Sequence, residues 1–325
     1  MRRIPSLLLG TLAAAGLGLS TAAAETWDMP TPYPDGNFHT QNIRQFADEV
    51  KQLSGGKLEL VIHSGASLFK MPEIKRAVRS GQAPIGEILL SAYGNDNPIF
   101  EVDGIPFLAA GYDNAAKLWQ AQKPVLEQVL AEEDIVVLYA VSWPGQALYS
   151  KTAVESLDDM KGVKFRAYNA ATSRLAELMG AVPTTVQYAE VPQAFATGVV
   201  SSMLTSATTG VDTQSWDFLD YHYTTNAMHP KNAVLVNKAA FEALDEDVRQ
   251  ALLTAAANAE ARGWEMCKAS GAEAEKTLAD NGMKVLPPSD ALKSGLEEVG
   301  KTMTDEWLAK AGDDGKQLIE AYNAM

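Results

Sequence analysis

The chain has 325 residues, 46% of them hydrophobic, which is enough to bury a sizeable core, and it carries a formal net charge of −14. This acidity excludes nucleic acid and other polyphosphates as partners, because they carry charge of the same sign. The single cysteine, Cys267, excludes a disulfide within the chain, so packing has to stabilise the fold.

The N-terminal 24 residues have the pattern of a cleaved signal peptide. Arg2 and Arg3 precede an uncharged run, 4–19, and small residues follow at 22–24. Glycines make this run too weakly apolar for a membrane anchor, and no cysteine follows it to carry a lipid. We predict cleavage near Ala24, a periplasmic location, and a mature chain that does not insert into a membrane. Loss of the two arginines changes its net charge from −14 to −16.

The opening third is predicted to alternate strands and helices. The segment after His39 places its apolar residues on one helical face, and Gly55 ends that helix. Residues 58–62 alternate as in a half-buried strand. Pro72 begins a second helix, and the apolar run 85–90 predicts a buried strand. This alternation is typical of an α/β lobe.

The same alternation recurs after Pro144 and predicts a second α/β lobe. Its strands and helices are expected at 164–168, 170–179, 182–187 and 191–197.

One unusually long helix is predicted near the C-terminus. The stretch 245–280 contains no proline, is rich in alanine and begins with acidic residues. Gly263 and Gly271 are the positions at which it could be interrupted. A continuous helix of roughly 36 residues would span about 54 Å, which is more than one small lobe requires. Such a helix could brace two lobes.

Nothing in the sequence is typical of an enzyme active site. It lacks the GxSxG, HExxH and GxxxxGK[ST] patterns. Cys267 lies inside the long predicted helix, with no cationic cluster to activate its thiol. No pair at a metal-ligand spacing occurs among the histidines, which are His39, His63, His222 and His229. We therefore predict no catalytic residue, no metal site and no cofactor.

Three motifs follow one another in the second lobe. Residues 160–172 read Met-Lys-Gly-Val-Lys-Phe-Arg-Ala-Tyr-Asn-Ala-Ala-Thr, residues 180–184 read Gly-Ala-Val-Pro-Thr, and residues 189–194 read Ala-Glu-Val-Pro-Gln-Ala. Their combined spacing resembles the solute-binding proteins of tripartite ATP-independent periplasmic (TRAP) transporters. The resemblance extends more weakly over the whole mature chain.

The resemblance implies an α/β fold of the two-lobed periplasmic binding protein kind, similar to type II. In it the long helix runs along both lobes, and the chain crosses between them more than once. We place the first lobe at 25–143 and 233–270, and the second at 144–232 and 271–325.

The resemblance also implies a ligand anchor, because the family arginine that matches Arg166 pairs with a substrate carboxylate. A guanidinium suits this role since its charge is permanent and its planar fork meets a carboxylate at two points. The competing interpretation is a surface residue at a strand end. Where the family often has asparagine this chain has Thr205, and where some members have a second arginine it has Gln146. The one remaining strong cation favours a monoanion over a dicarboxylate.

Further candidate ligand-binding residues fall into groups, each with an ordinary core, turn or capping role as its alternative. Aromatic side chains that could enclose a flat ligand are Trp143, Tyr168, Tyr188, Trp216 and Tyr93. Side chains that could hydrogen bond to ligand oxygens are Ser91, Asn169 and Ser206. Phe38 lies where the family places a ligand-facing loop, and Glu190 either contacts the ligand or caps the helix that follows.

The sequence therefore predicts the periplasmic solute-binding subunit of a TRAP transporter, and not an enzyme. Its ligand is expected to be a small organic carboxylate with an aromatic, hydroxy or keto body. Its other partners are expected to be the integral membrane subunits of the transporter. The alternatives are a binding protein for another transporter class, a ligand-sensing adaptor and a secreted α/β enzyme.

Overall fold

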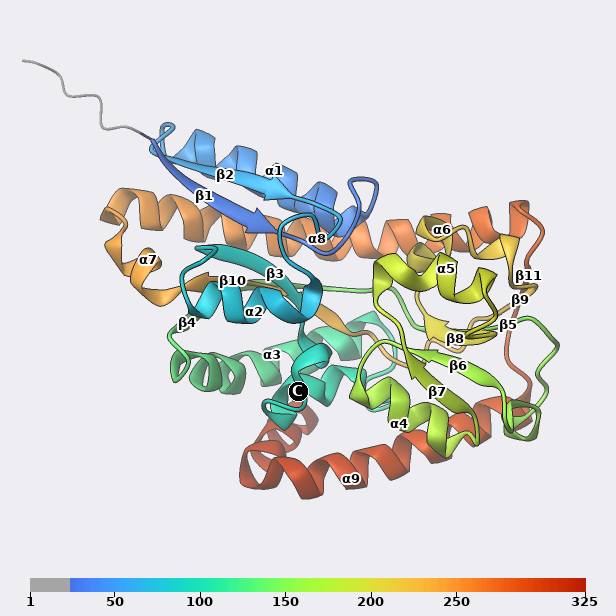
Figure 1. Ribbon diagram of the computed structural model, residues 1–325. Helices are drawn as coiled ribbons and strands as arrows, with labels where there is room; N and C mark the ends of the chain where they lie inside the picture. Colours follow the sequence, from blue (N-terminus) through green and yellow to red (C-terminus); the bar gives the residue numbers. More distant parts are fainter. Residues whose placement is uncertain (1–23) are drawn as a thin grey trace, which may run out of the picture.

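A computed structural model describes residues 24–325. The predicted signal peptide, apart from Ala24, lies outside the described residues. Figure 1 shows two lobes side by side, with one long helix, α8, running along both of them and a second, α9, along the opposite side. The predicted two-lobed α/β class is confirmed.

The elements of the structure alternate along most of the chain. The helices are α1 Phe38–Leu53, α2 Met71–Arg79, α3 Tyr112–Ala131, α4 Ala170–Leu178, α5 Val191–Ala196, α6 Ala207–Asp212, α7 Lys238–Ala243, α8 Glu246–Asp280 and α9 Asp290–Asn323. The strands are β1 Glu25–Pro30, β2 Leu58–His63, β3 Ile85–Leu89, β4 Ile135–Ser142, β5 Ala147–Ser150, β6 Lys164–Ala167, β7 Val182–Thr185, β8 Ser202–Thr205, β9 Tyr221–Tyr223, β10 Lys231–Asn237 and β11 Lys284–Leu286.

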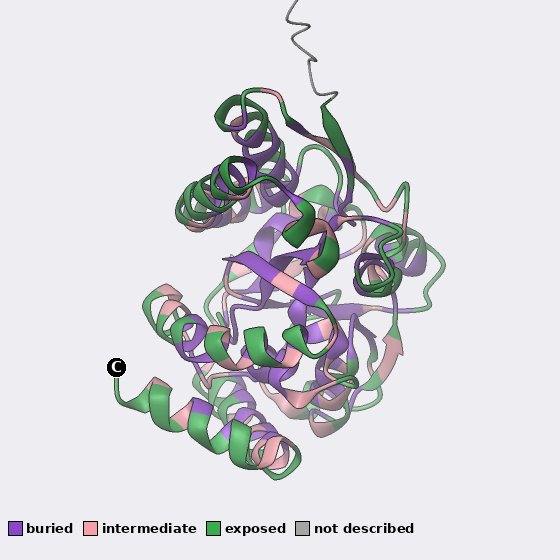
Figure 2. Cartoon of the chain, turned by 90° about the vertical axis from the view of Figure 1, so that its left-hand side faces the viewer, coloured by how far each residue is buried: buried purple, intermediate pink, exposed green. Residues whose placement is uncertain are grey.

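One lobe is built on the sheet β3-β10-β4, with the parallel pair β1-β2 beside it (Figure 1). The central strand β10 is antiparallel to both neighbours, so that Val234 lies opposite Glu87 of β3 and Tyr139 of β4. Nearly every residue of β10 is buried, because helices cover the sheet. Figure 2 shows this division, with buried strands inside and helices whose outer faces are exposed.

The other lobe is built on the six-stranded sheet β11-β9-β5-β8-β6-β7. Strand β6 is parallel to β7 and β8, and this register places Arg166 opposite Thr184 on one side and Met203 on the other. Because β6 lies inside the sheet, the backbone of Arg166 is held on both sides.

Two of the segments that carry the chain between the sheets are hydrogen-bonded to each other. One joins β4 to β5 and the other joins β9 to β10, and their backbones pair: Trp143 donates to Pro230 (2.8 Å), Gln146 donates to Met228 (2.9 Å), and Ala227 donates back to Gln146 (3.0 Å). This pairing forms a two-stranded hinge. The lobe boundary proposed after Trp143 falls inside it.

Helix α8 runs from Glu246 to Asp280 without a break and contacts α1 and β4 in one lobe and α6 and β11 in the other. The long helix is therefore confirmed, and interruption at Gly263 or Gly271 does not occur. A Cβ at Gly263 would lie 2.4 Å from Val141 Cγ2 and 2.7 Å from Asn42 Nδ2. Glycine is present there because neighbouring elements approach the helix closely, and this packing outweighs its low helix propensity.

Helix α9 packs against α3 and the 3₁₀-helix Pro98–Gly104 as well as against α4. It therefore contacts elements of both proposed lobes. Within residues 24–325, no helix combines the length and apolar character needed to cross a bilayer.

Candidate functional site: a buried arginine between the lobes

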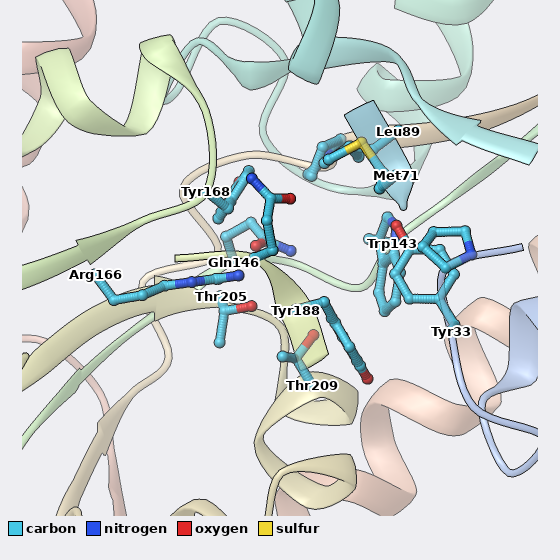
Figure 3. A pocket seen from close by; sticks show the side chains of 13 residues that line it. Tyr33, Met71, Leu89, Trp143, Gln146, Arg166, Tyr168, Tyr188, Thr205 and Thr209 are labelled. Carbon is cyan, nitrogen blue, oxygen red and sulfur yellow. The ribbon is translucent and has the colours of Figure 1, made fainter. Parts of the chain in front are cut away.

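A cavity of about 50 Å³ lies where the two lobes and the hinge meet (Figure 3). This volume is several times the roughly 10–15 Å³ that one water molecule requires, so the space suits a small ligand. The lining residues are Pro32, Tyr33, Met71, Leu89, Trp143, Gln146, Arg166, Tyr168, Gln187, Tyr188, Thr205, Thr209 and Pro230. Arg166 is the one charged residue among them.

Arg166 is only 2% exposed. Its Nε donates to the carbonyl of Val186 (3.0 Å), and its guanidinium carbon lies 5.0 Å from the centroid of the Tyr168 ring. Among residues 24–325, no Asp or Glu oxygen lies within 4.0 Å of its nitrogens. Burial lowers the pKa of Arg166 to about 10, so the group stays charged at neutral pH. A buried cation without an anion is costly, and an anionic ligand would supply the missing charge.

Two polar side chains extend the charged end of the cavity. In Figure 3 the guanidinium of Arg166 reaches toward Gln146 and Thr205. The Gln146 amide donates from Nε2 to the carbonyl of Pro144 (3.0 Å), which leaves its Oε1 as an acceptor. The hydroxyl of Thr205 adds a donor. This end of the site can therefore bind an anion and hydrogen bond to neighbouring polar atoms.

Aromatic rings form the opposite wall. The Tyr33 ring packs edge-to-face on Trp143 (centroids 4.9 Å apart) and on Tyr188 (5.0 Å). Asn232 fixes two of these side chains, because its Oδ1 accepts from Trp143 Nε1 (2.9 Å) and from the Tyr33 hydroxyl (3.3 Å). Rings held in this way suit a flat or apolar ligand body.

A buried carboxylate, Glu87, supports this wall from behind. It accepts hydrogen bonds from the Asn232 amide (3.0 Å) and the Thr31 hydroxyl (2.6 Å), and it lies 3.5 Å from His39 Nδ1. Burial raises the pKa of Glu87 to about 7, although the two hydrogen bonds oppose this shift. Burial also lowers the pKa of His39 well below its usual value. Both groups are therefore pushed toward their neutral forms.

These two pKa shifts make opposite contributions to stability. The contribution of Glu87 is present below about pH 4.5 and is lost as the pH rises through about 7, because the folded protein holds this proton more tightly. The contribution of His39 is present above about pH 6.5 and is lost as the pH falls.

We expect the Glu87→Gln variant to remove only the first of these contributions, since glutamine can still accept from Asn232. From pH 4.5 to 7, its free energy of unfolding should rise relative to wild type by up to about 3 kcal/mol. Urea unfolding at pH 5, 6 and 7 measures this difference. Parallel pH profiles for the two proteins would show that Glu87 does not titrate in this range.

Six of the thirteen residues predicted to bind ligand line the cavity: Trp143, Gln146, Arg166, Tyr168, Tyr188 and Thr205. The other seven do not: Phe38, Ser91, Tyr93, Asn169, Glu190, Ser206 and Trp216. A direct role in binding remains a prediction for all of them.

Three of the seven have hydrogen bonds that explain their positions. Asn169 caps α4 through its Oδ1 and donates from Nδ2 to the Ser91 hydroxyl (2.9 Å), which links the two lobes. The Tyr93 hydroxyl donates to the carbonyl of Met71 (2.7 Å). These contacts hold the lobes and the cavity wall in place without facing the cavity.

The remaining four have capping or packing roles. Ser206 caps α6, and exposed Glu190 accepts from the backbone N–H of Gln187 (3.4 Å). Trp216 packs against the core of the second lobe. Phe38 packs edge-to-face on Trp143 with ring centroids 5.5 Å apart, and so supports the wall of the cavity.

Seven lining residues were not predicted: Pro32, Tyr33, Met71, Leu89, Gln187, Thr209 and Pro230. Tyr33 stands between two prolines, directly after β1, and Thr209 follows the predicted Thr205 and Ser206. A tyrosine in a rigid loop after a parallel strand is a usable signal for a ligand site.

A two-lobed fold with a cavity where the lobes meet, lined by a buried arginine that has no acidic partner among residues 24–325, is typical of a binding protein for a small anion. The chain belongs to the bacterial extracellular solute-binding protein family 7, whose model, DctP, matches residues 31–311. The predicted membership in the TRAP solute-binding proteins is confirmed. This is a family of extracytoplasmic receptors and not of enzymes.

Solved structures and curated relatives agree with this assignment. The chain is 51% identical to DctP6 of Bordetella pertussis, an extracytoplasmic solute receptor binding pyroglutamic acid, with 92% of this chain and 100% of that chain covered and a TM-score of 0.91. It is 42% identical to a marine metagenome TRAP solute-binding protein specific for pyroglutamate, with 93% and 99% covered and a TM-score of 0.91. A solute-binding protein of Albidiferax ferrireducens is 28% identical, with 98% and 97% covered.

Proposed function

We propose that this protein is the periplasmic receptor of a TRAP transporter for pyroglutamate, the cyclic lactam of glutamate. The observation that carries the proposal is the buried Arg166, which lacks an acidic partner among the described residues. Since Arg166 is the one charged residue in the lining, a monoanion neutralises the site and a dianion leaves one charge unmatched.

The chemistry of pyroglutamate fits the arrangement of the cavity. Its carboxylate pairs with the guanidinium of Arg166. Its lactam N–H and C=O require one acceptor and one donor, which Gln146 Oε1 and the Thr205 hydroxyl offer near the charged end. Its compact ring matches the small space beside Tyr33 and Trp143. The two receptors at 51% and 42% identity, both of which bind pyroglutamate, support the same ligand.

The receptor acts outside the cytoplasm, after cleavage of the signal peptide near Ala24, and delivers its ligand to the two integral membrane subunits of the transporter. It binds one ligand per chain and does not turn it over. Ligand between the lobes stabilises the closed form, because only that form contacts the ligand from both sides.

Calorimetric titration of the purified mature chain tests the ligand. We expect L-pyroglutamate to bind with a stoichiometry of one and to be recovered unchanged. L-proline lacks the lactam carbonyl, so the hydrogen-bonding groups meant for it stay unpaired, and its affinity should be at least about 10-fold lower. Succinate should bind more weakly still, because its second carboxylate meets no cation. Tighter binding of succinate or of D-glucuronate than of pyroglutamate would contradict the proposal.

A further inference from the structure

One hydrogen-bonded link crosses from lobe to lobe at the edge of the cavity. The Asp212 carboxylate oxygen Oδ2 accepts from the Asn37 amide (2.8 Å) and from the Tyr188 hydroxyl (2.5 Å). Asn37 precedes α1 in the first lobe, whereas Asp212 and Tyr188 belong to the second. We call these three residues the Asn37–Asp212–Tyr188 link.

The link stands between the cavity and the solvent. Tyr188 lines the cavity, whereas Asn37 and Asp212 line a separate, open crevice of about 260 Å³ between α1, α6 and α8. Breaking the link would therefore release the wall that separates the two spaces. This places it on a route by which a ligand can leave.

Each end of the link is fixed by its own element. Asn37 caps α1, since its Oδ1 accepts from the backbone N–H of His39 (2.9 Å), and its Nδ2 is thereby aimed at the other lobe. Asp212 is the last residue of α6. The Tyr188 ring packs edge-to-face on Tyr33 of the first lobe with centroids 5.0 Å apart. The Asp212 carboxylate therefore bonds both to the first lobe, through Asn37, and to the cavity wall, through Tyr188.

We propose that Asp212 is a positioning residue that latches the lobes around the ligand and sets how slowly the ligand leaves. The inference rests on the proposed function, since it takes the ligand to lie in the cavity beside Tyr188. The Asp212 carboxylate holds Tyr188 over the cavity through a bond within the second lobe. Its bond to Asn37 crosses between the lobes and therefore exists only when they are closed. The latch contributes to the dissociation rate and leaves the association rate unchanged.

Introducing a negative charge at position 37 tests the latch without removing the cap of α1. Asn37→Asp keeps an acceptor for the N–H of His39, because aspartate is an equally good N-cap, but it sets one carboxylate against another. We expect the dissociation rate of L-pyroglutamate, measured by stopped-flow fluorescence, to rise about 10- to 100-fold. Asp212→Asn added to Asn37→Asp restores a donor opposite a carboxylate and should return the rate to within a few fold of wild type. The matched control is Asp217→Asn, an exposed residue nearby, which should change nothing.

The outcomes separate the latch from the choice of ligand. If the dissociation rate of L-pyroglutamate from the Asn37→Asp variant equals that from wild type, the latch is overturned. The same holds if the rate from the double variant stays as high as that from Asn37→Asp. Neither result affects the proposed ligand. The radius of gyration of each ligand-free protein, from small-angle X-ray scattering, measures closure of the lobes and does not depend on the choice of ligand. If wild type fails to bind pyroglutamate while Asn37→Asp is more open and the double variant is not, the ligand assignment fails and the latch holds.

Discussion

Replacing Arg166 with methionine is expected to abolish measurable binding of pyroglutamate. Methionine fills a similar volume without a charge, so the ligand carboxylate would enter a closed cavity with no counter-ion. Removing one partner of a buried ion pair costs about 3–5 kcal/mol, which corresponds to a loss of affinity of at least about 100-fold. Calorimetric titration with L-pyroglutamate measures the loss.

The stability of the ligand-free protein provides a second measurement. Arg166 is buried and pairs with no carboxylate of residues 24–325. Its replacement by methionine should therefore leave the melting temperature of the ligand-free protein unchanged or higher, while abolishing the rise on adding ligand. The control is Arg44→Met, because Arg44 is an exposed arginine in α1 paired with Asp35. Full affinity in the Arg166→Met variant would contradict both the anchor and the proposed function.

Local sequence patterns were sufficient to predict α1, β2, α2, β3, β6, α4, β7, α5 and α8, whereas the other helices and strands of residues 24–325, the long helix α9 among them, were not predicted. Strand β6 ends at Ala167, one residue before the predicted end, because Asn169 caps the helix that follows. The long helix begins at Glu246, against a prediction of 245. In both cases the determinants lie within a few residues of each other in the chain, so the sequence alone reveals them.

Packing across the fold could not be predicted in this way. Gly263 looked like a possible break in the long helix, yet the helix continues, because Val141 and Asn42 approach it closely. Those contacts join residues far apart in the chain. A glycine in a helical pattern therefore indicates either a break or a close neighbour, and local sequence does not distinguish the two.

The same difference between local sequence patterns and contacts across the fold applies to the candidate site. Arg166, Gln146 and Thr205 were predicted because they stand at motif positions, and they line the cavity. Ser91 and Asn169 were predicted because their side chains can hydrogen bond to a ligand, and they hydrogen bond to each other instead. A buried amide satisfied by its own neighbours has no donor left for a ligand, and only the assembled lobes reveal which amides are so satisfied.

The second large effect is expected at a buried ion pair that does not touch the cavity. Lys231 begins β10, and Asp103 lies in the 3₁₀-helix Pro98–Gly104; both side chains are fully buried, with Nζ and Oδ2 3.5 Å apart. Burial lowers the pKa of Lys231 and raises that of Asp103. Among the described residues, Lys231 Nζ and Asp103 Oδ1 have no hydrogen-bond partner. Each charge therefore depends on the other.

We expect Lys231→Met to lower the free energy of unfolding by about 3–5 kcal/mol, because it leaves the Asp103 carboxylate buried and unpaired. Adding Asp103→Leu removes that charge as well and should recover most of the loss, since an apolar pair of similar volume can replace a buried ion pair. Urea unfolding of the three proteins measures both steps. The exposed pair Lys161 and Asp158 gives the control, and Lys161→Met should leave the unfolding midpoint unchanged. If the double variant were less stable than Lys231→Met, attraction within the pair would not be what stabilises this region, and the shape of the two side chains would matter more than their charge.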